Sequence, residues 1–498
     1  MDEDVNRYFQ RFQLLPHRWP PVTAASLLTH TSGIENWFLG TLVKRPSEVS
    51  SLEEYYAHRP PRTVQIPRTE LTYSNQGMAL AGYLVEAVSR QPFADYADIN
   101  IFRPLGMLHA TFRQRYAPAF RPYPAAALTC TVIDMGQFLR MQLNGGRVGE
   151  HQVLRPETVA DMQRQHWTAH AHAPGIAYGF FESFWNGERL LFHTGDSGDH
   201  SLFLLDPSRG WGLYFVYRGG GENAEKLREE FIGFLMNHYY PAPKFQLPTP
   251  KTGQADLRKY AGLHRASNVD PYTLEKVLGI SRQIHIQVVP GGYLRFREFG
   301  VRAVEVEPNL FRIEDGGYLS FRHAADGHIT GGTVTGSIWD PESFDRISGW
   351  ENGSLQFIIL GICVFILFSS LPWAAVDAIR RRRRPKVQIA RSEDKLAALG
   401  WRLSAYVPLI LLLGLVCFLA NLLVWRPPIT GIPPGGLVFL GCLLAASVVC
   451  LAMPVFAVLA WRRNALGVTH RVYLSVFSLA GIRFAAVLFY WNLLGFKI

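Results

Sequence analysis

Hydrophobic residues follow two different periods along the first half of the chain, and each period predicts a type of element. Apolar residues at helical spacing predict helices over 76–90, 131–143 and 224–239. Short runs bounded by glycine-containing turns predict strands at 190–194, 201–206 and 212–218. Helices combined with consecutive hairpin-like strands favour an α+β fold with an antiparallel sheet over a parallel βαβ arrangement.

Two of these helices carry an apolar stripe that predicts their buried side. The first helix is expected to have Asn75 as its N-cap, with a stripe of Met78, Ala81, Leu84, Val85 and Val88. The third is expected to bury Leu227, Phe231, Phe234 and Leu235. The second helix is expected to end at the Asn-Gly-Gly sequence of residues 144–146.

The pattern changes after residue 240 and divides the rest of the chain. Four prolines make 241–252 a stiff linker. Alternating short runs with Gly-Gly turns predict a small β barrel or sandwich over 253–347. Four apolar runs within 355–498 each exceed the roughly 20 residues needed to span a bilayer as a helix; they are 355–376, 403–425, 435–461 and 472–496. The last run contains one charge, Arg483, which marks either a path through the spans or a pairing with another helix.

Charge is distributed unevenly over the 498 residues, whose formal net charge is +10. Residues 355–498 hold 15 of the 50 Lys and Arg residues and only 3 of the 40 Asp and Glu residues. Most of these basic residues lie in the loops 380–402 and 462–471, which the positive-inside rule places in the cytoplasm. We therefore expect a multi-pass integral membrane protein in contact with the lipid bilayer. Its soluble domains are expected outside the cytoplasm of a bacterial inner membrane, with no nucleic-acid partner.

Four short motifs stand in a distinctive order along the first 240 residues. They are Leu-Leu-Thr-His-Thr-Ser-Gly at 27–33, Tyr-Ser-Asn at 73–75, Ile-Phe-Arg-Pro-Leu-Gly-Met at 101–107 and His-Thr-Gly at 193–195. Their order and spacing resemble the serine β-lactamase and penicillin-binding-protein superfamily, in its class C β-lactamase-like, esterase and D-aminopeptidase-like branch. The resemblance implies that residues 1–240 are a serine hydrolase domain.

That family attacks amide or ester carbonyls with a serine and passes through an acyl-enzyme. The resemblance implies that Tyr73 is the general base and that His193 replaces the lysine of the family's Lys-Thr-Gly strand. It implies substrate contacts from Asn75, Thr194 and Gly195, and an oxyanion donor at the backbone N–H of Asp196. The substrate would be a cell-wall peptide, a β-lactam or an ester at the external face. No cofactor and no metal are expected.

The nucleophile of the family, a Ser-x-x-Lys ahead of the first motif, is missing. Only Ser392-Glu-Asp-Lys395 matches it, and this match follows the other motifs and lies in a predicted cytoplasmic loop, so we regard it as chance. The chain also opens on the acidic Met1-Asp-Glu-Asp without a secretory signal. Two explanations remain: an N-terminally truncated membrane-anchored hydrolase, or a pseudoenzyme that acts as a cell-envelope binding or sensor protein. A third hypothesis makes the four spans the working part of a transporter or sensor.

Structural interpretations stand beside these functional ones. Taken alone, Tyr73 is a packed aromatic before a helix, and His193 is a strand histidine with a satisfied hydrogen bond. His30 and Ser32 are expected to shape a turn. As it stands, the chain is expected not to form an acyl-enzyme, because Tyr73 has no lysine beside it to lower its pKa.

Overall fold

The structure, a computed structural model, describes residues 1–15, 19–196, 198–219, 221–243, 245–250, 253–336, 340–383, 395–424 and 431–497. The chain forms two compact units. The first comprises Met1–Trp37, Thr41–Asp270 and Arg282–Ile347, and the second comprises Phe38–Gly40, Pro271–Ser281 and Ser348–Ile498.

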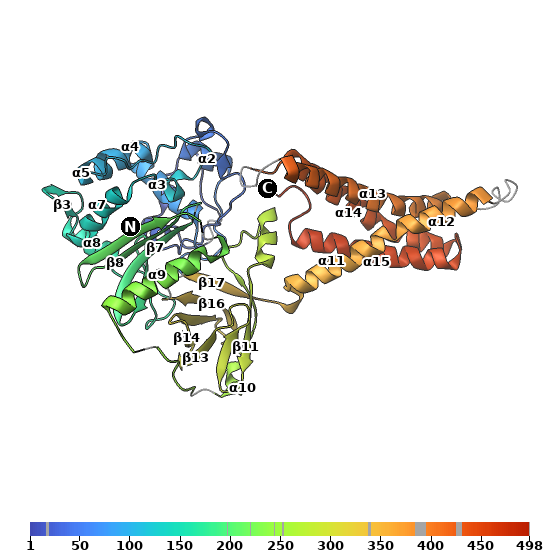
Figure 1. Ribbon diagram of the computed structural model, residues 1–498. Helices are drawn as coiled ribbons and strands as arrows, with labels where there is room; N and C mark the ends of the chain where they lie inside the picture. Colours follow the sequence, from blue (N-terminus) through green and yellow to red (C-terminus); the bar gives the residue numbers. More distant parts are fainter. Residues whose placement is uncertain are drawn as a thin grey trace. The chain divides into compact units, whose positions relative to one another are not determined.

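A five-stranded antiparallel sheet organises the N-terminal part of the first unit (Figure 1). Its strands follow in chain order: β5 (Ile176–Ala177), β6 (Phe180–Trp185), β7 (Glu188–Asp196), β8 (His200–Asp206) and β9 (Trp211–Tyr217). The three predicted strands are therefore confirmed as β7, β8 and β9, and the α+β fold class with them. Side chains alternate between the two faces of such a sheet, so each strand contributes to two separate cores.

Each face of the sheet is covered by one long helix. Helix α9 (Ala224–Tyr239) places Ile232 and Met236 against Phe192 and Leu202 on one face. Helix α7 (Val132–Leu143) places Leu139 against residues on the opposite face. Thr131 caps α7 by accepting from the N–H of Asp134 at 3.1 Å, and the glycines after it have positive φ, which confirms the predicted start and end.

The remaining N-terminal elements build two further cores, an aromatic one that contains Phe9, Phe12, Trp37, Tyr56 and Tyr83 and a second one that contains Phe102, Leu105, Met141 and Val159. The helices are α1 (Ala24–Leu28), α2 (Leu52–His58), α3 (Asn75–Ser89), α4 (Phe93–Ala97), α5 (Arg103–Leu105), α6 (Tyr123–Ala126) and α8 (Pro156–Gln163). Two short strand pairs accompany them, β1 (Leu42–Val43) with β2 (Ala119–Phe120) and β3 (Arg147–Val148) with β4 (His151–Gln152).

The predicted buried stripes of two helices are only partly right, although the helices themselves are confirmed: Ala81 and Leu84 of α3 and Leu235 of α9 pack against buried clusters. In α3 the buried side contains Gln76, Leu80 and Tyr83, whereas Val88 is 61% exposed. Gln76 is buried because its amide donates to the carbonyl of Trp37, a polar contact that an apolar pattern does not show. The N-cap is also corrected: it is Ser74, whose hydroxyl accepts from the N–H of Gly77 at 2.9 Å.

In α9 the buried side is one position away from the predicted stripe. Arg228, Ile232 and Met236 are buried at four-residue spacing, whereas Leu227 and Phe234 are 51% and 71% exposed. The apolar pattern does not predict this face because Arg228 lies in the buried row, and a buried charge requires a partner that lies elsewhere in the sequence.

The all-β region is a closed eight-stranded barrel, and its core contains Leu294, Phe311, Leu319 and Phe344. The short helix α10 (Gln254–Leu257) precedes it. The strands are β10 (Gly262–Ala266), β11 (Gln283–Val289), β12 (Tyr293–Phe296), β13 (Arg302–Glu307), β14 (Leu310–Ile313), β15 (Tyr318–His323), β16 (Ile329–Thr335) and β17 (Glu342–Ile347). Pairing of β10 with β17 closes the barrel and removes its exposed edges.

The barrel and the N-terminal sheet belong to one compact unit and are joined by polar contacts. The hydroxyl of Ser183 on β6 donates to the carbonyl of Gly336, just after β16, at 2.9 Å. Arg322 on β15 binds the carboxylate of Glu70 at 2.5 Å. Glu70 is only 5% exposed and lies three residues before Tyr73, so the barrel fixes the segment that leads to this tyrosine.

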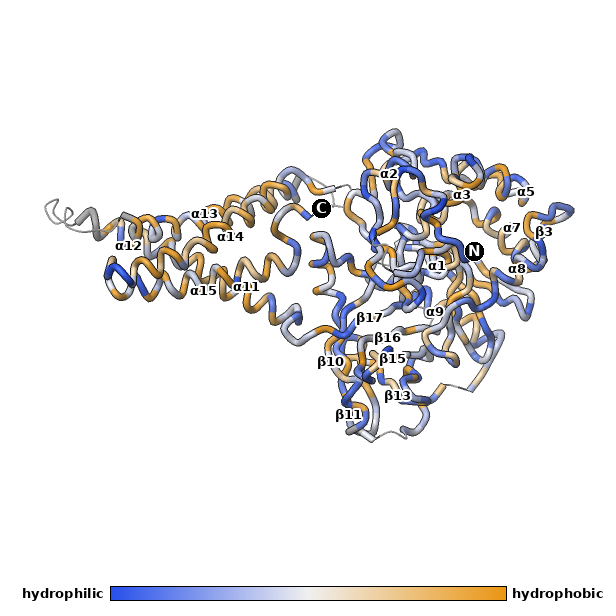
Figure 2. The backbone as a smooth tube through the Cα atoms, turned by 180° about the vertical axis from the view of Figure 1, so that it is seen from behind, coloured by the Kyte–Doolittle hydropathy of each residue, from blue (hydrophilic) through white to orange (hydrophobic). Residues whose placement is uncertain are grey.

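The second unit contains four helical segments that are long and apolar enough to cross a membrane: Gly353–Ile379, Leu399–Asn421, Pro434–Arg462 and Val468–Tyr490. The first segment combines α11 (Gly353–Phe368) with most of α12 (Ser370–Arg383); the others belong to α13 (Lys395–Val424), α14 (Pro434–Arg462) and α15 (Val468–Tyr490). Their apolar character is evident in Figure 2.

The predicted fourth span, 472–496, is corrected at both ends, because α15 begins at Val468 and ends at Tyr490. Asn492 has a left-handed backbone with φ of 57°. Its side-chain amide donates to the carbonyls of Pro271 and Thr273 at 2.8 and 2.9 Å. The apolar run continues beyond the helix because Leu493 and Leu494 pack against the helix core without being helical.

Small residues allow the helices of this unit to approach closely. A Cβ atom on Gly414 would lie 2.7 Å from the Cβ of Cys442, and one on Gly481 would lie 2.8 Å from the Cβ of Cys450. The guanidinium of Arg483 lies 5.1 Å from the ring centre of Trp350. This cation–π contact supports a pairing role for Arg483, although with an aromatic ring instead of a polar group.

Candidate active site

The first two motifs interlock through hydrogen bonds around His30. The N–H of Thr72 donates to the His30 carbonyl at 2.7 Å, and the N–H of Ser74 donates to the His30 Nδ1 at 3.3 Å. Complete burial lowers the pKa of His30 to about 3, so the ring is neutral and can accept this bond. His30 has a φ of 52°, which agrees with its expected role in a turn.

The start of α3 is fixed by further contacts with the segment after His30. The Ser74 hydroxyl donates to the Glu35 carbonyl at 2.9 Å, and the N–H of Asn75 donates to the Asn36 Oδ1 at 3.1 Å. These bonds hold the first turn of the helix by its backbone. The side chains of Tyr73 and Asn75 are thereby placed next to each other, with the Tyr73 hydroxyl 3.5 Å from the Asn75 Oδ1.

Tyr73 lies among the rings of His30 and His193, which come from two of the other motifs, and of Phe181 on β6. Its ring centre is 4.3 Å from that of His30, 6.3 Å from Phe181 and 6.4 Å from His193. Burial raises the pKa of Tyr73 well above its ordinary value, and the nearby carboxylates of Asp340 and Asp196 raise it further. At neutral pH its hydroxyl is therefore protonated.

His193 lies on the part of β7 that extends beyond its neighbour. Pairing of β7 with β6 ends at the Phe192–Phe181 pair, so among the described residues those from 193 to 196 have a strand partner, β8, on one side only. The His193 ring stacks on Phe181 at 5.1 Å, and its Nδ1 lies 2.6 Å from the carbonyl oxygen of Thr194. The open edge of β7 offers backbone groups to an extended ligand.

The barrel contributes one carboxylate to this edge. The hydroxyl of Thr194 donates to the Oδ1 of Asp340 at 2.6 Å, across 146 residues of sequence. Asp340 was not found by the sequence analysis, and no local pattern marks it, because only the packing of the barrel brings it there. Gly195 follows Thr194, and a Cβ at this position would meet the Ser201 hydroxyl at 2.6 Å, so a larger residue here requires that this hydroxyl rotates away.

Asp196 belongs to a charged cluster instead of standing free at the end of the strand. Arg228 of α9 binds its carboxylate at 3.2 Å, and the Nδ1 of His200 lies 2.5 Å from it. The Arg228 side chain is 5% exposed, so Asp196 is the partner that makes its burial possible. The carboxylate of Asp196 is thus occupied, and only its backbone is available for the predicted oxyanion role.

The structure therefore brings together Tyr73, Asn75, His193, Thr194 and Gly195, with Asp196 at the end of the same strand. Within the part of the chain that the structure describes, burial and two carboxylates account for the shift in the pKa of Tyr73, and no lysine or arginine opposes them. Residues 392–394 of the Ser392–Lys395 match lie outside the described residues, and Lys395 begins α13. A cavity of about 730 Å³ lies elsewhere, lined by residues such as Tyr8, Tyr83 and Glu86.

The sheet, its two covering helices and the tyrosine and histidine motifs define a domain of the β-lactamase and penicillin-binding-protein class. Residues 1–234 match the family model described as Beta-lactamase, so this part of the chain is a Beta-lactamase domain. Four apolar helices that fit a membrane anchor follow it in the chain.

Curated relatives agree with this assignment. Protein flp of Staphylococcus aureus (strain MRSA252) is 23% identical over 274 residues, which are 48% of this chain and 51% of that protein. PbpX of Bacillus subtilis (strain 168) is 32% identical over 114 residues, which are 22% of this chain and 27% of that protein. The chain thus spans about half the length of the Staphylococcus relatives it matches.

Solved structures with similar chains include SurE with D-Leu, at a TM-score of 0.45 and 18% identity over 66% of this chain and 78% of that one. The octameric penicillin-binding protein homologue from Pyrococcus abyssi aligns at a TM-score of 0.37 and 20% identity, over 69% of this chain and 82% of that one.

Proposed function

We propose that the protein is a membrane-anchored serine hydrolase of the β-lactamase-related type, whose site receives an amide or ester substrate along the free edge of β7. The observation that supports this proposal is the convergence of Tyr73, Asn75 and His193 with Thr194 beside that edge. These residues come from two distant segments that a single structural core holds together.

In the proposed complex the substrate backbone lies against β7, where Thr194 and Gly195 contact its acyl side. The backbone N–H of Asp196 donates to the carbonyl oxygen and stabilises the negative charge that develops when the carbonyl is attacked. Asn75 binds the substrate amide, and Tyr73 lies on the opposite side of the reacting carbonyl.

The step that fails in the described chain is proton removal from a nucleophile. A tyrosine acts as a base at neutral pH only if a neighbouring cation lowers its pKa, and here burial, together with two carboxylates, raises the pKa of Tyr73. We therefore expect this chain to bind acyl substrates without becoming acylated. The same observation favours a second candidate function, a catalytically inactive binding or sensor protein of the cell envelope.

Asp340 narrows the class of substrate. Its carboxylate already accepts the hydroxyl of Thr194, the group that the family resemblance assigns to the carboxylate or carbonyl side of the substrate. Two carboxylates competing for one hydroxyl repel each other. We propose that the site prefers neutral esters or substrates with an amino group over β-lactams, which agrees with a histidine at position 193 where β-lactamase relatives have lysine.

The experiment is to add a fluorescent penicillin and a chromogenic short-chain ester to the full chain in detergent. We expect saturable, reversible binding that Gly195→Val abolishes, with no labelled band after denaturation. Absence of any binding would refute the site, and covalent labelling would refute our account of Tyr73. A fusion that places a Ser-x-x-Lys helix ahead of residue 1 separates the two candidates, because turnover supports the hydrolase and continued inactivity supports the binding protein.

We further propose that the soluble domains face the outside of a bacterial inner membrane, supported by the basic loops between the apolar runs. In a variant without native cysteines, Lys386→Cys is expected to be protected from an impermeant thiol reagent in spheroplasts. Glu150→Cys, on an exposed turn, is the matched accessible position. Labelling of the first position with protection of the second would reverse this orientation.

A further inference from the structure

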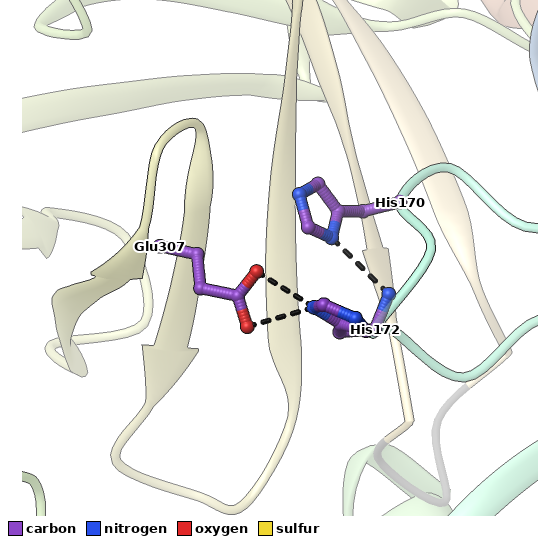
Figure 3. Close-up of side chains that lie close together, drawn as sticks. All are labelled: His170, His172 and Glu307. Carbon is purple, nitrogen blue, oxygen red and sulfur yellow. Dashed lines mark hydrogen bonds and ion pairs between the residues drawn. The ribbon is translucent and has the colours of Figure 1, made fainter.

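Two histidines and a glutamate meet where the loop before β5 lies beside the barrel, within the first unit. His170 and His172 belong to the loop between α8 and β5, and Glu307 ends β13. Figure 3 shows the Glu307 carboxylate facing the His172 ring, with the His170 ring beside them and one of its nitrogens joined to His172. Each residue offers one ligand atom, and these three atoms lie within 4.8 Å of one another.

The contacts within this cluster show which atoms are available. The Nδ1 of His172 lies 2.7 and 2.8 Å from the two carboxylate oxygens of Glu307, so it donates a proton to them. The Nδ1 of His170 accepts a hydrogen bond from the backbone N–H of His172 at 3.3 Å, a long and weak bond. The two ring centres are 5.8 Å apart in an edge-to-face arrangement.

We propose that His170, His172 and Glu307 form a binding site for a divalent transition-metal ion of the Zn²⁺ type. Imidazole nitrogen and carboxylate oxygen are ligands that Zn²⁺ takes at about 2.0–2.2 Å, with neighbouring ligand atoms about 3.3–3.5 Å apart in a tetrahedron. The Nδ1 of His172 and the Glu307 oxygens, now 2.7–2.8 Å apart, must separate by under about 1 Å. The most distant two of the three ligand atoms, which lie within 4.8 Å, must approach each other by about 1.5 Å. Side-chain rotation covers both changes, because His172 is 67% exposed and Glu307 is 40% exposed.

Metal binding replaces a proton at a stated atom. Zn²⁺ binds the Nδ1 of His172, so the neutral imidazole carries its single proton on Nε2 instead, while the carboxylate of Glu307 supplies a negatively charged ligand oxygen. Three protein ligands leave the fourth position of a tetrahedron to water. The consequence is a link between the loop 164–175 and β13 that replaces a single exposed hydrogen bond.

The loop connects this site to the candidate active site without contributing to its chemistry. Trp167, three residues before His170, packs against the core that includes Tyr73, and its indole N–H donates to the Arg68 carbonyl at 3.3 Å. A metal ion bound by His170, His172 and Glu307 would thus link the loop that contains Trp167 to β13 of the barrel. The sequence signal for the site is the His-x-His spacing of residues 170 and 172.

The test is a zinc titration of the full chain in detergent, with any affinity tag removed and the protein first treated with EDTA. Equilibrium dialysis with metal analysis is expected to show one equivalent of Zn²⁺ that His170→Ala, His172→Ala or Glu307→Gln each weakens by more than about 10-fold. Co²⁺ in the same site is expected to give the visible absorption of a tetrahedral complex, and Zn²⁺ is expected to raise the melting temperature of the parent but not of these three variants.

The matched control is His285→Ala. His285 forms a similar pair with Glu298, at 2.5 Å, but does not belong to a three-ligand group among the described residues. Its variant is expected to bind Zn²⁺ like the parent. Equal zinc binding by all variants, no bound zinc in the parent, or full binding by Glu307→Gln would each overturn the proposed site.

Discussion

Asp340 allows the proposed substrate preference to be tested by removing a single charge. The substitution Asp340→Asn keeps an oxygen that can accept the Thr194 hydroxyl and removes the negative charge. A substrate carboxylate bound at the same hydroxyl would lie about 4 Å from Asp340, where two unit charges repel by about 1 kcal/mol in water and about 4 kcal/mol near a protein surface. Because Asp340 is exposed, we take the lower value, a factor of about 5 in affinity.

The assay compares two ligands that differ by one charge, a penicillin and its methyl ester. The variant is expected to bind the free acid about 5-fold more tightly and the ester unchanged, with a smaller difference at high salt. Asp326→Asn is the control, since Asp326 is an exposed acid between β15 and β16, at the other end of β16 from Gly336. An equal gain for both ligands, or no gain for the acid, would refute the electrostatic reasoning.

Three further predictions concern the stability of the first unit. Arg228→Met leaves the partly buried carboxylate of Asp196 without its cation, so it is expected to lower the free energy of unfolding by about 2–4 kcal/mol and with it the melting temperature. The control Lys226→Met, at an exposed position, is expected to lower the free energy of unfolding by less than about 0.5 kcal/mol. Burial and a neighbouring aspartate raise the pKa of Glu35 from 4.5 to about 7. The contribution of Glu35 to stability is therefore complete below pH 4.5 and is lost as the pH rises through 7, a loss on the order of 3 kcal/mol. Melting curves of Glu35→Gln at different pH values should not show this loss. Gly33→Ala would place a Cβ 2.1 Å from a backbone oxygen, at a φ of 68°, and is expected to prevent folding. The control Gly40→Ala, at a φ of 75° in open space, is expected to lower the free energy of unfolding by about 1 kcal/mol. Equal melting temperatures of the two variants in circular dichroism would contradict this.

The elements of the fold could be predicted wherever local chemistry decides them. Thr131 and Asp134 mark the start of α7 by a reciprocal cap, which needs no tertiary partner. The apolar runs after residue 354 exceed the thickness of a bilayer, so their helical structure follows from length and composition. The fourth run is confirmed as a helix, but its predicted end lies too far along the chain, because apolar residues continue past the end of α15 at Tyr490.

The faces of the helices could not be predicted, because they depend on polar partners distant in sequence. Arg228 is buried in α9 only because Asp196 lies at the end of β7, and Gln76 is buried in α3 only because the Trp37 carbonyl accepts its amide. A hydrophobic stripe describes which residues avoid water, but a paired polar side chain can replace an apolar one in the core.

The sequence by itself determined the family, the motif residues and the apolar helices, because each depends on residue types at short spacing. Tertiary structure alone decided the charge around Tyr73, since Asp340 reaches Thr194 from 146 residues away through the packing of the barrel. It also decided that His170 and His172 meet Glu307. Electrostatic and ligand geometry depend on distances in space, and these distances arise only when separate layers of the fold pack together.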